Sequence, residues 1–446
     1  MRFENKKQII ANGKTDEIKK IRKDILEMLS TAIDAVDPYC VVSSQFDKFV
    51  LKIDSKKVNL ADFSNIYLVA FGKASIGMTQ AALDHCEISK GVVITNDITQ
   101  KIKNPAIDVF YGDHPIPNDD SINGAKAAEK LISQVSENDL LLILISGGGS
   151  ALLCHPRVSL KDLQETTSYL LKSGANIQEI NTIRKHISYV KGGQLIQNAK
   201  CQVISFVISD VIGDPLSFIA SGPTIGDETK YEHAKNIFEK YNLWEIIPKS
   251  VQSVIIQGIA KEIPETPFIH EISKDKVKNM VIANNTLACE TLLHHAEKLG
   301  YKPSLYSTTL QGEARIVGNQ LVDILIEKNK KEEINMLIAG GETTVTVKGS
   351  GKGGRNQEMV LASLNNLQKN SIVFASFGTD GIDGMSTAAG AIADSNSLKR
   401  AIDKNLNVDV FLADNNSNVF FHEINDLLIT GPTGTNVMDV QILIKQ

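Results

Sequence analysis

The chain lacks the features that mark several classes of protein. Its net charge of −5 provides no basic excess for neutralising nucleic-acid phosphates, so we expect no nucleic-acid partner. Its five cysteines form no CxxC pair, which predicts neither a disulfide framework nor a zinc site and favours the reducing cytoplasm. No apolar run approaches the roughly 18 residues of a membrane span, and the first residues include lysines but no apolar segment. We therefore expect neither a membrane span nor a signal peptide.

Two common catalytic patterns are also missing. The nine histidines show no HExxH or other metal spacing, and there is no GxSxG elbow for a serine hydrolase. With 446 residues the chain exceeds the size at which a single core stops growing, so two domains are expected. Prolines and mixed charges weaken the pattern between Lys249 and Lys278. We place the boundary there, predicting domains of residues 1–270 and 271–446.

Strand and helix patterns alternate along both predicted domains. This order predicts an α/β fold in each domain. The first is expected to hold a Rossmann-like, mostly parallel sheet with helices on both faces, and the second to be a smaller α/β domain. The final strand, Val437–Ile444, is compatible with packing back on the first domain. We expect the active site in the cleft between the two domains.

The most informative stretch is Leu140–Leu153, with the sequence LLLILISGGGSALL. Its first six residues form an unbroken apolar run, which is typical of a strand buried on both faces. Gly147, Gly148 and Gly149 follow, and without Cβ atoms they let backbone N–H groups lie against a ligand. Ser150 and the apolar residues after it suit a first helical turn, whose free N–H groups attract anions. A strand, a glycine turn and a helix start together predict a phosphate site. The alternative is a tight turn without a ligand.

Two further junctions have a charged residue where a predicted strand ends. Lys73 follows the strand Ile66–Phe71 and precedes a helical run. A lysine beside the positive end of a helix dipole is unfavourable unless an anion lies between them, although a solvated surface lysine remains possible. Asp210 follows the apolar strand Cys201–Ser209. An aspartate there points into the crevice where α/β sheets bind ligands and is a candidate magnesium ligand, although a plain helix N-cap remains possible.

One glycine pattern in the second domain has to be weighed separately. Gly349, Gly351 and Gly354 satisfy the GxGxxG pattern of dinucleotide sites, and a helix follows them. The preceding segment, Thr343–Lys348, alternates polar and apolar residues, which predicts a half-exposed antiparallel strand rather than a Rossmann first strand. Lys352 is followed by glycine rather than Ser or Thr, so the segment is not a Walker A loop. The pattern therefore gives little support to a nicotinamide site.

Seven motifs, in this order and spread over nearly the whole chain, resemble the class II glycerate kinases, the glycerate 2-kinase family with a MOFRL-type C-terminal domain. They are FGKAS (71–75), SGGGSALL (146–153), NTIRKHISYVKGGQL (181–195), SDVIGDPLSFIASGPT (209–224), GGETTVTVKGSGKGGRNQE (340–358), GTDGIDG with AAGA (378–391) and TGPTGTNV (430–437). One departure is Asn118, where an aspartate is expected, and it affects only a minor loop contact.

The resemblance implies transfer of phosphate from ATP to the 2-hydroxyl of D-glycerate with Mg²⁺, giving 2-phosphoglycerate and ADP. It also implies that Lys73 and Arg355 lie closest to the chemistry, Lys73 neutralising the transferred phosphoryl group and Arg355 clamping a carboxylate or phosphate. Together with this resemblance, the motifs lead us to expect that Gly147–Ser150 and Lys191 bind the nucleotide. Asp210 is expected to bind Mg²⁺. Asp380, at the end of a predicted strand, could accept the hydroxyl proton, or simply form a turn with the glycine after it.

Other functions stay open from the sequence alone. The family is often labelled hydroxypyruvate reductase, so a reductase using NAD(P)H is the main alternative. A kinase acting on a related small hydroxy acid is another, and a silent nucleotide- or sugar-phosphate-binding regulator is a third. The expected partners are thus a small-molecule substrate and a nucleotide. The oligomeric state remains open, a homodimer included.

Overall fold

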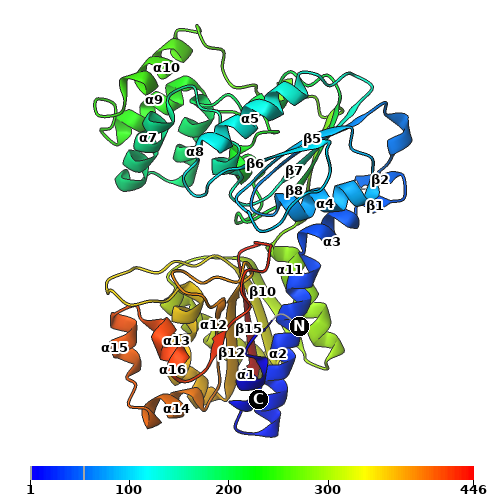
Figure 1. The fold of residues 1–446 in the computed structure, drawn as a ribbon. Helices are drawn as coiled ribbons and strands as arrows, with labels where there is room; N and C mark the ends of the chain where they lie inside the picture. Colours follow the sequence, from blue (N-terminus) through cyan, green and yellow to red (C-terminus); the bar gives the residue numbers. More distant parts are fainter. Residues whose placement is uncertain (1–2, 54–55) are drawn as a thin grey trace. The chain divides into compact units, whose positions relative to one another are not determined.

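A computed structural model describes residues 3–53 and 56–446. It divides the chain into two compact units, and each contains a six-stranded sheet. One unit, here called the sheet-first unit, spans residues 38–282, and the other, the split unit, combines residues 1–37 with residues 283–446. Figure 1 shows the elements of each unit. Within the described residues, no helix has the length and apolar character needed to cross a membrane.

The sheet-first unit has the strand order of a Rossmann fold. Its strands lie in the order β6-β5-β4-β7-β8-β9, and the pairings from β6 to β8 are all parallel. This order confirms the predicted Rossmann-like sheet. The strands are β4 (Ile66–Phe71), β5 (Lys90–Thr95), β6 (Ile107–Tyr111), β7 (Leu140–Ile145), β8 (Gln202–Ile208) and β9 (Val277–Ala283).

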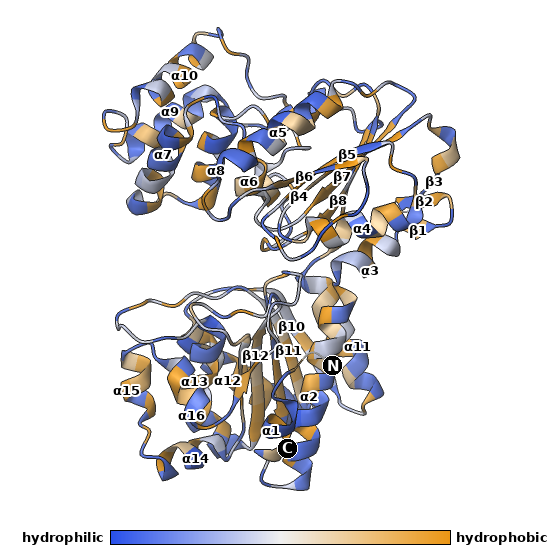
Figure 2. Cartoon of the chain, in the orientation of Figure 1, coloured by the Kyte–Doolittle hydropathy of each residue, from blue (hydrophilic) through white to orange (hydrophobic). Residues whose placement is uncertain are grey.

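The strands of this sheet are apolar because both of its faces are covered. All six residues of β7 are buried, as the unbroken apolar run predicts. Val69 and Phe71 of β4 pack into one cluster with Ala125 and Ala128 of α5. Figure 2 shows the apolar colouring of the strands. The helices of the unit are α3 (Pro38–Ser43), α4 (Ser75–His85), α5 (Asp119–Ile132), α6 (Gly149–Leu152), α7 (Leu160–Ser173), α8 (Ile177–His186), α9 (Tyr231–Lys240) and α10 (Lys249–Ile259). A small sheet contains β1 (Phe46–Asp47), β2 (Val50–Ile53) and β3 (Lys56–Asn59).

The split unit contains a mixed sheet in the order β10-β11-β15-β12-β13-β14. Only the pair β10 and β11 is parallel, and the other neighbours are antiparallel. The strands are β10 (Pro303–Leu310), β11 (Met336–Gly341), β12 (Ile372–Gly378), β13 (Gly390–Ala393), β14 (Leu427–Leu428) and β15 (Asp439–Lys445). The helices are α1 (Lys6–Ala11), α2 (Asp16–Ala35), α11 (Asn285–Lys298), α12 (Ala314–Glu332), α13 (Arg355–Asn370), α14 (Ser397–Asp403), α15 (Val408–Ala413) and α16 (Ser417–Glu423).

The observed division differs from the predicted domains 1–270 and 271–446. Residues 1–37 belong with the C-terminal part of the chain because α2 packs on α11 and because Arg22 forms buried ion pairs with Asp394 and Asp426. The second sheet also keeps the final strand, since β15 pairs with β11 on one side and β12 on the other. The final strand, for which the sequence left packing on the first domain open, is therefore a strand of the second sheet. In addition, β9, beyond residue 270, completes the first sheet.

Two local predictions also need correction. The sequence pattern predicts a helix over residues 180–199, but α8 ends at His186, and the chain after it turns with positive φ at Gly192 and Gly193. Residues 343–348 are not a strand and form only an isolated bridge between Thr344 and Glu313. The antiparallel partner of β11 is the distant strand β15 instead.

Candidate active site

The loops that leave β4 and β7 meet at the point where the strand order of the first sheet reverses. The chain runs outward from β4 to β6 and then returns to place β7 against the other side of β4. Such switch points are where open α/β sheets bind ligands. The backbone N–H of Lys73 donates to the carbonyl of Gly147 at 2.9 Å, so the two loops are joined directly. Gly72 is needed here, because a Cβ would lie 2.2 Å from the hydroxyl of Ser146 and its φ is +119°.

The turn after β7 joins the strand to a short helix, as the sequence predicts. Gly148 adopts φ +80°, and the short helix α6 begins at Gly149. A Cβ on Gly148 would lie 3.3 Å from Cγ of Lys73 and 3.1 Å from Cδ2 of His114, so both side chains flank this turn. Lys73 is exposed and keeps its ammonium group available at the edge of the sheet. The structure thus brings Lys73 and the glycine turn together, as their positions after neighbouring strands predict.

Hydrogen bonds from buried polar side chains hold the backbone of this glycine turn. The ammonium of Lys191 donates to the carbonyls of Ser150 and Leu153 at 2.7 and 3.1 Å, and burial lowers the pKa of Lys191 to about 8. The hydroxyl of Ser150 lies 3.0 Å from that of Ser221, which donates to Oδ1 of Asn181. Lys191 therefore fixes the backbone of the turn. Its direct contact with a nucleotide stays a prediction.

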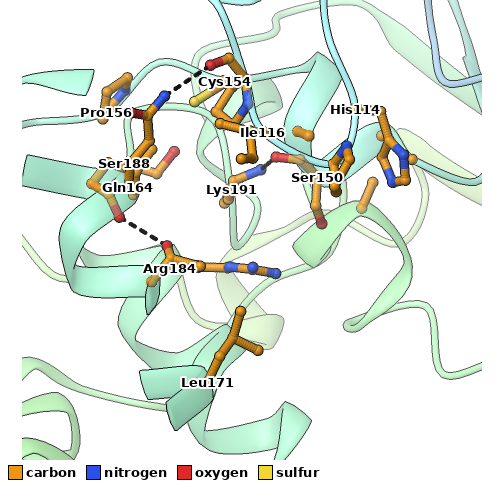
Figure 3. A pocket seen from close by; sticks show the side chains of 18 of the residues that line it. His114, Ile116, Ser150, Cys154, Pro156, Gln164, Leu171, Arg184, Ser188 and Lys191 are labelled. Carbon is orange, nitrogen blue, oxygen red and sulfur yellow. Dashed lines mark hydrogen bonds between the residues drawn. The ribbon is translucent and has the colours of Figure 1, made fainter. Parts of the chain in front are cut away.

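A cavity of about 630 Å³ opens beside the turn, and Figure 3 shows part of its lining. Gly147–Ser150, Lys191 and Asp210 all line it. Asp210 lies tightly against the turn, because a Cβ on Gly147 would come within 2.2 Å of its Oδ2. A side chain at position 147 would therefore displace this carboxylate. The predicted nucleotide residues and the predicted magnesium ligand consequently line one cavity.

The chemistry of the Asp210 carboxylate would suit a magnesium ion, which prefers oxygen ligands. Across residues 3–53 and 56–446, no cluster of three or more His, Cys, Asp or Glu side chains could hold a metal by itself. Mg²⁺ usually keeps several waters and binds through one or two carboxylates plus substrate phosphates. Asp210 beside the glycine turn provides one such carboxylate.

His114 and Arg184 also line the cavity, although the sequence analysis assigned neither a role. Burial and the neighbouring Lys73 lower the pKa of His114, which favours the neutral ring. The three basic residues in the last turn of α8, Arg184, Lys185 and His186, have different surroundings. Lys185 pairs with Asp227, and the ring of the buried His186 forms a hydrogen bond with the carbonyl of Thr182. Only Arg184 reaches the cavity. Arg184 lies four residues after the buried Ile180, but this spacing does not set it apart, because Lys185 and His186 beside it are themselves buried.

The second group of candidate residues lies on glycine-rich loops of the split unit. Arg355 is the first residue of α13, and its guanidinium forms a bidentate pair with Asp439, at 2.5 and 3.0 Å. The same group donates to Glu342 at 2.7 Å. These contacts raise the pKa of Arg355 despite the opposing effect of burial, and about a third of its side chain stays exposed. The arginine is therefore held in a fixed orientation with part of its fork accessible.

Asp380 and Asp383 have different positions in the following loop. Asp383 is buried and accepts hydrogen bonds from the backbone N–H groups of Asn356 and Gln357, so it caps α13. Burial raises the pKa of Asp383. Asp380 accepts from the N–H of Ile382 at 3.0 Å, which is the turn-forming role that the sequence left open. Its part in proton transfer remains a prediction.

The GxGxxG pattern has a packing explanation. A Cβ on Gly349 or Gly351 would lie within 2.4–2.6 Å of the backbone of Asp414, and one on Gly354 would lie 2.2 Å from Oδ1 of Asp383. These glycines are required because the loop passes close to its neighbours. The pattern therefore needs no dinucleotide to account for it.

The departure at Asn118 also has a local role. Its side chain accepts from the N–H of Ser121 at 2.9 Å and forms a capping box at the start of α5. It also donates to the carbonyl of Tyr111 and to Asp113. Asparagine and aspartate are equivalent N-cap residues, so this position keeps its function as a helix start.

The geometry predicts an acid limb in the activity. Burial raises the pKa of Asp439 to about 6, so this carboxyl protonates below that pH and one anchor of Arg355 weakens. We expect kcat/KM to fall as the pH decreases, with a midpoint near pH 6. The D439N variant should not show this fall, and its kcat/KM at neutral pH should be lower than that of the wild type. Measuring kcat/KM between about pH 5 and 8 checks this prediction.

A stability measurement separates this effect from unfolding. Because folding raises the pKa of Asp439, its stabilising contribution is full at low pH and is lost as pH rises through about 6. Activity and this contribution to stability should thus change in opposite directions across the same range. An acid limb unchanged in D439N would show that another group is responsible.

These features define a two-unit α/β protein whose first unit has a Rossmann strand order and a glycine turn at its switch point. The chain belongs to the glycerate kinase family with a C-terminal MOFRL domain. Residues 24–256 match the model described as Domain of unknown function (DUF4147), and residues 335–439 match the MOFRL family.

Individual relatives agree over nearly the full length. The chain is 41% identical to the glycerate 2-kinase of Pyrococcus horikoshii, covering 95% of this chain and 97% of the relative. It is 36% identical to the D-glycerate 2-kinase of Thermotoga maritima, over 95% and 98% of the two chains. The crystal structure of a glycerate kinase from Thermotoga maritima matches with a TM-score of 0.85 at 35% identity, over 96% and 100% of the chains.

Proposed function

We propose that this protein is a glycerate 2-kinase, which transfers the terminal phosphoryl group of ATP to the 2-hydroxyl of D-glycerate and releases 2-phosphoglycerate and ADP. The main support is the 41% identity with a glycerate 2-kinase along nearly the whole chain. The glycine turn and Lys73 at the switch point give this similarity a chemical basis.

Phosphoryl transfer needs positioning and charge neutralisation more than covalent participation by the protein. Backbone N–H groups of Gly147–Ser150 would hold the nucleotide phosphates, and Lys73 would neutralise charge on the group being transferred. Asp210 would hold Mg²⁺, which supplies further neutralisation when it is bound. Its place beside the glycine turn supports this role.

The acceptor would be bound by residues of the split unit. Arg355 has the planar fork that binds a carboxylate at two points, and its pairing with Asp439 supports a fixed orientation. Asp380 would accept the proton from the 2-hydroxyl as the hydroxyl oxygen attacks phosphorus. Its bond to the N–H of Ile382 occupies one carboxylate oxygen.

Release of ADP tests this function directly. Purified protein with Mg-ATP should form ADP in proportion to added D-glycerate and little without an acceptor. L-glycerate and lactate, offered separately, test the alternative of a related hydroxy acid. A reductase would instead oxidise NADH with hydroxypyruvate. ADP formation that is indifferent to every acceptor, or NADH oxidation alone, would contradict the proposal.

A further inference from the structure

The cavity beside the glycine turn has an unusual balance of charge. Arg184, Lys191 and Lys172 line it, and Asp210 is the only carboxylate among the lining residues. A cavity with an excess of one charge concentrates ligands of the opposite sign. Its remaining wall is largely apolar, with Ile116, Leu163 and Leu171 among the lining side chains. It therefore combines a cationic part with an apolar part.

Arg184 differs from Lys191 and Lys185 because no residue in the described part of the chain matches its charge. Lys191 donates to two carbonyls, and Lys185 pairs with Asp227. The guanidinium of Arg184, by contrast, makes no hydrogen bond or ion pair with any residue in the described part of the chain. Burial lowers the pKa of Arg184, which reflects the cost of removing its charge from water. An unmatched, half-buried guanidinium calls for an anionic ligand.

The side chain of Arg184 also lies in the part of the cavity that Ser150 and Lys191 line. Figure 3 shows the side chain of Arg184 reaching across the cavity below Ser150 and Lys191. Its charge affects the pKa of Lys191, whose ammonium holds the backbone of that turn. Arg184 and the N–H groups of the turn can therefore face one extended anion such as a polyphosphate.

We propose that Arg184 binds a phosphate group of the nucleotide, and that the base and sugar lie toward the apolar wall formed by Ile116, Leu163 and Leu171. This inference rests on the proposed function, in which a nucleotide binds at Gly147–Ser150. Ile116 and Leu171 are 61% and 63% exposed, which is unusual for large apolar residues beside a cavity and suits a flat ring packed against them. A volume of about 630 Å³ lies within the range of small-molecule sites.

Binding measurements without glycerate separate the two parts of this assignment. Isothermal titration with ADP, inorganic tripolyphosphate and adenosine should show that R184M weakens ADP and tripolyphosphate by about 10- to 100-fold, the effect of a charge-assisted hydrogen bond, and leaves adenosine unchanged. R184K should recover only part of the loss, because lysine lacks the planar fork. L171S should weaken ADP and adenosine alike and leave tripolyphosphate unchanged.

The controls keep this result separate from folding and from the kinase activity itself. K161M removes an exposed lysine of α7 that is not among the lining residues and should bind all three probes normally. R184M should melt no lower than the wild type, because it removes an unmatched, half-buried charge. Unchanged ADP affinity in R184M, or a raised KM for glycerate instead, would overturn the role. Failure of the wild type to phosphorylate glycerate would reject the proposed function and leave the nucleotide site standing.

Discussion

Replacing Lys73 with methionine should lower kcat/KM for glycerate phosphorylation by about 10²–10³-fold, the usual effect of removing one preorganised donor from the transition state. Methionine keeps the length of the side chain and removes only the charge. The side chain of Lys73 is exposed, and the contact that joins its loop to Gly147 uses the backbone N–H, so the fold should not change. Steady-state rates at saturating ATP and D-glycerate measure the effect.

A matched lysine tests whether this loss is specific. Lys126 is an exposed lysine on α5 with no place at the switch point, and K126M should keep wild-type rates. K73R should retain part of the activity because it keeps the charge with a different donor geometry. A K73M enzyme within about threefold of the wild type would remove Lys73 from the mechanism.

Replacing Arg22 with methionine should cost about 3–5 kcal/mol of stability in the split unit, the usual loss when one member of a buried charge cluster is removed. Arg22, Asp394 and Asp426 all have fully buried side chains. Burial by itself would raise the pKa of Asp426, but Arg22 and Arg400 lower it overall. Without Arg22, two buried carboxylates would share Arg400 alone.

Urea unfolding followed by two probes locates the loss. Trp244, the only tryptophan, lies in the sheet-first unit, so its fluorescence follows that unit while circular dichroism follows both. The transition of the split unit should move to lower urea, and K19M, which breaks an exposed pair with Asp16, should cost less than about 1 kcal/mol. A loss of that small size in R22M would contradict the structural role.

The same cluster predicts how stability depends on pH. Because the folded pKa of Asp426 is lowered, its contribution is present above the ordinary carboxyl pKa and is lost as pH falls through the lowered value. The wild type should therefore lose stability in acid, and R22M should lose less because its Asp426 starts without that partner. Equal acid slopes in the two proteins would exclude Arg22 as the cause.

The sequence predicts those parts of the fold that depend on local pattern. β4 and β7 occur over the predicted residues Ile66–Phe71 and Leu140–Ile145, because a strand buried on both faces must be apolar throughout. The place of α2 could not be predicted in this way. It depends on contacts between Arg22 and two aspartates more than 370 residues away, and such pairing leaves no periodic signal.

Some residues of the candidate site could likewise be predicted from the sequence, and others could not. Glycine turns mark the loops, so Lys73, Gly147 and Asp210 could be found from their positions after strands. The functions of cations inside α8 could not be assigned from composition, because Arg184, Lys185 and His186 are adjacent and reach three different environments. The sequence shows which residues are basic, but the fold is needed to show which of them lacks an ion-pair partner within the described residues.

The most direct test of the account is the ³¹P NMR spectrum of the product formed from Mg-ATP and D-glycerate. Phosphate on the 2-hydroxyl is coupled to one proton and gives a doublet, whereas phosphate on the 3-hydroxyl is coupled to two and gives a triplet. The account predicts the doublet of 2-phosphoglycerate together with the signals of ADP. A triplet, or a spectrum of ATP and ADP without a new ester, would contradict it.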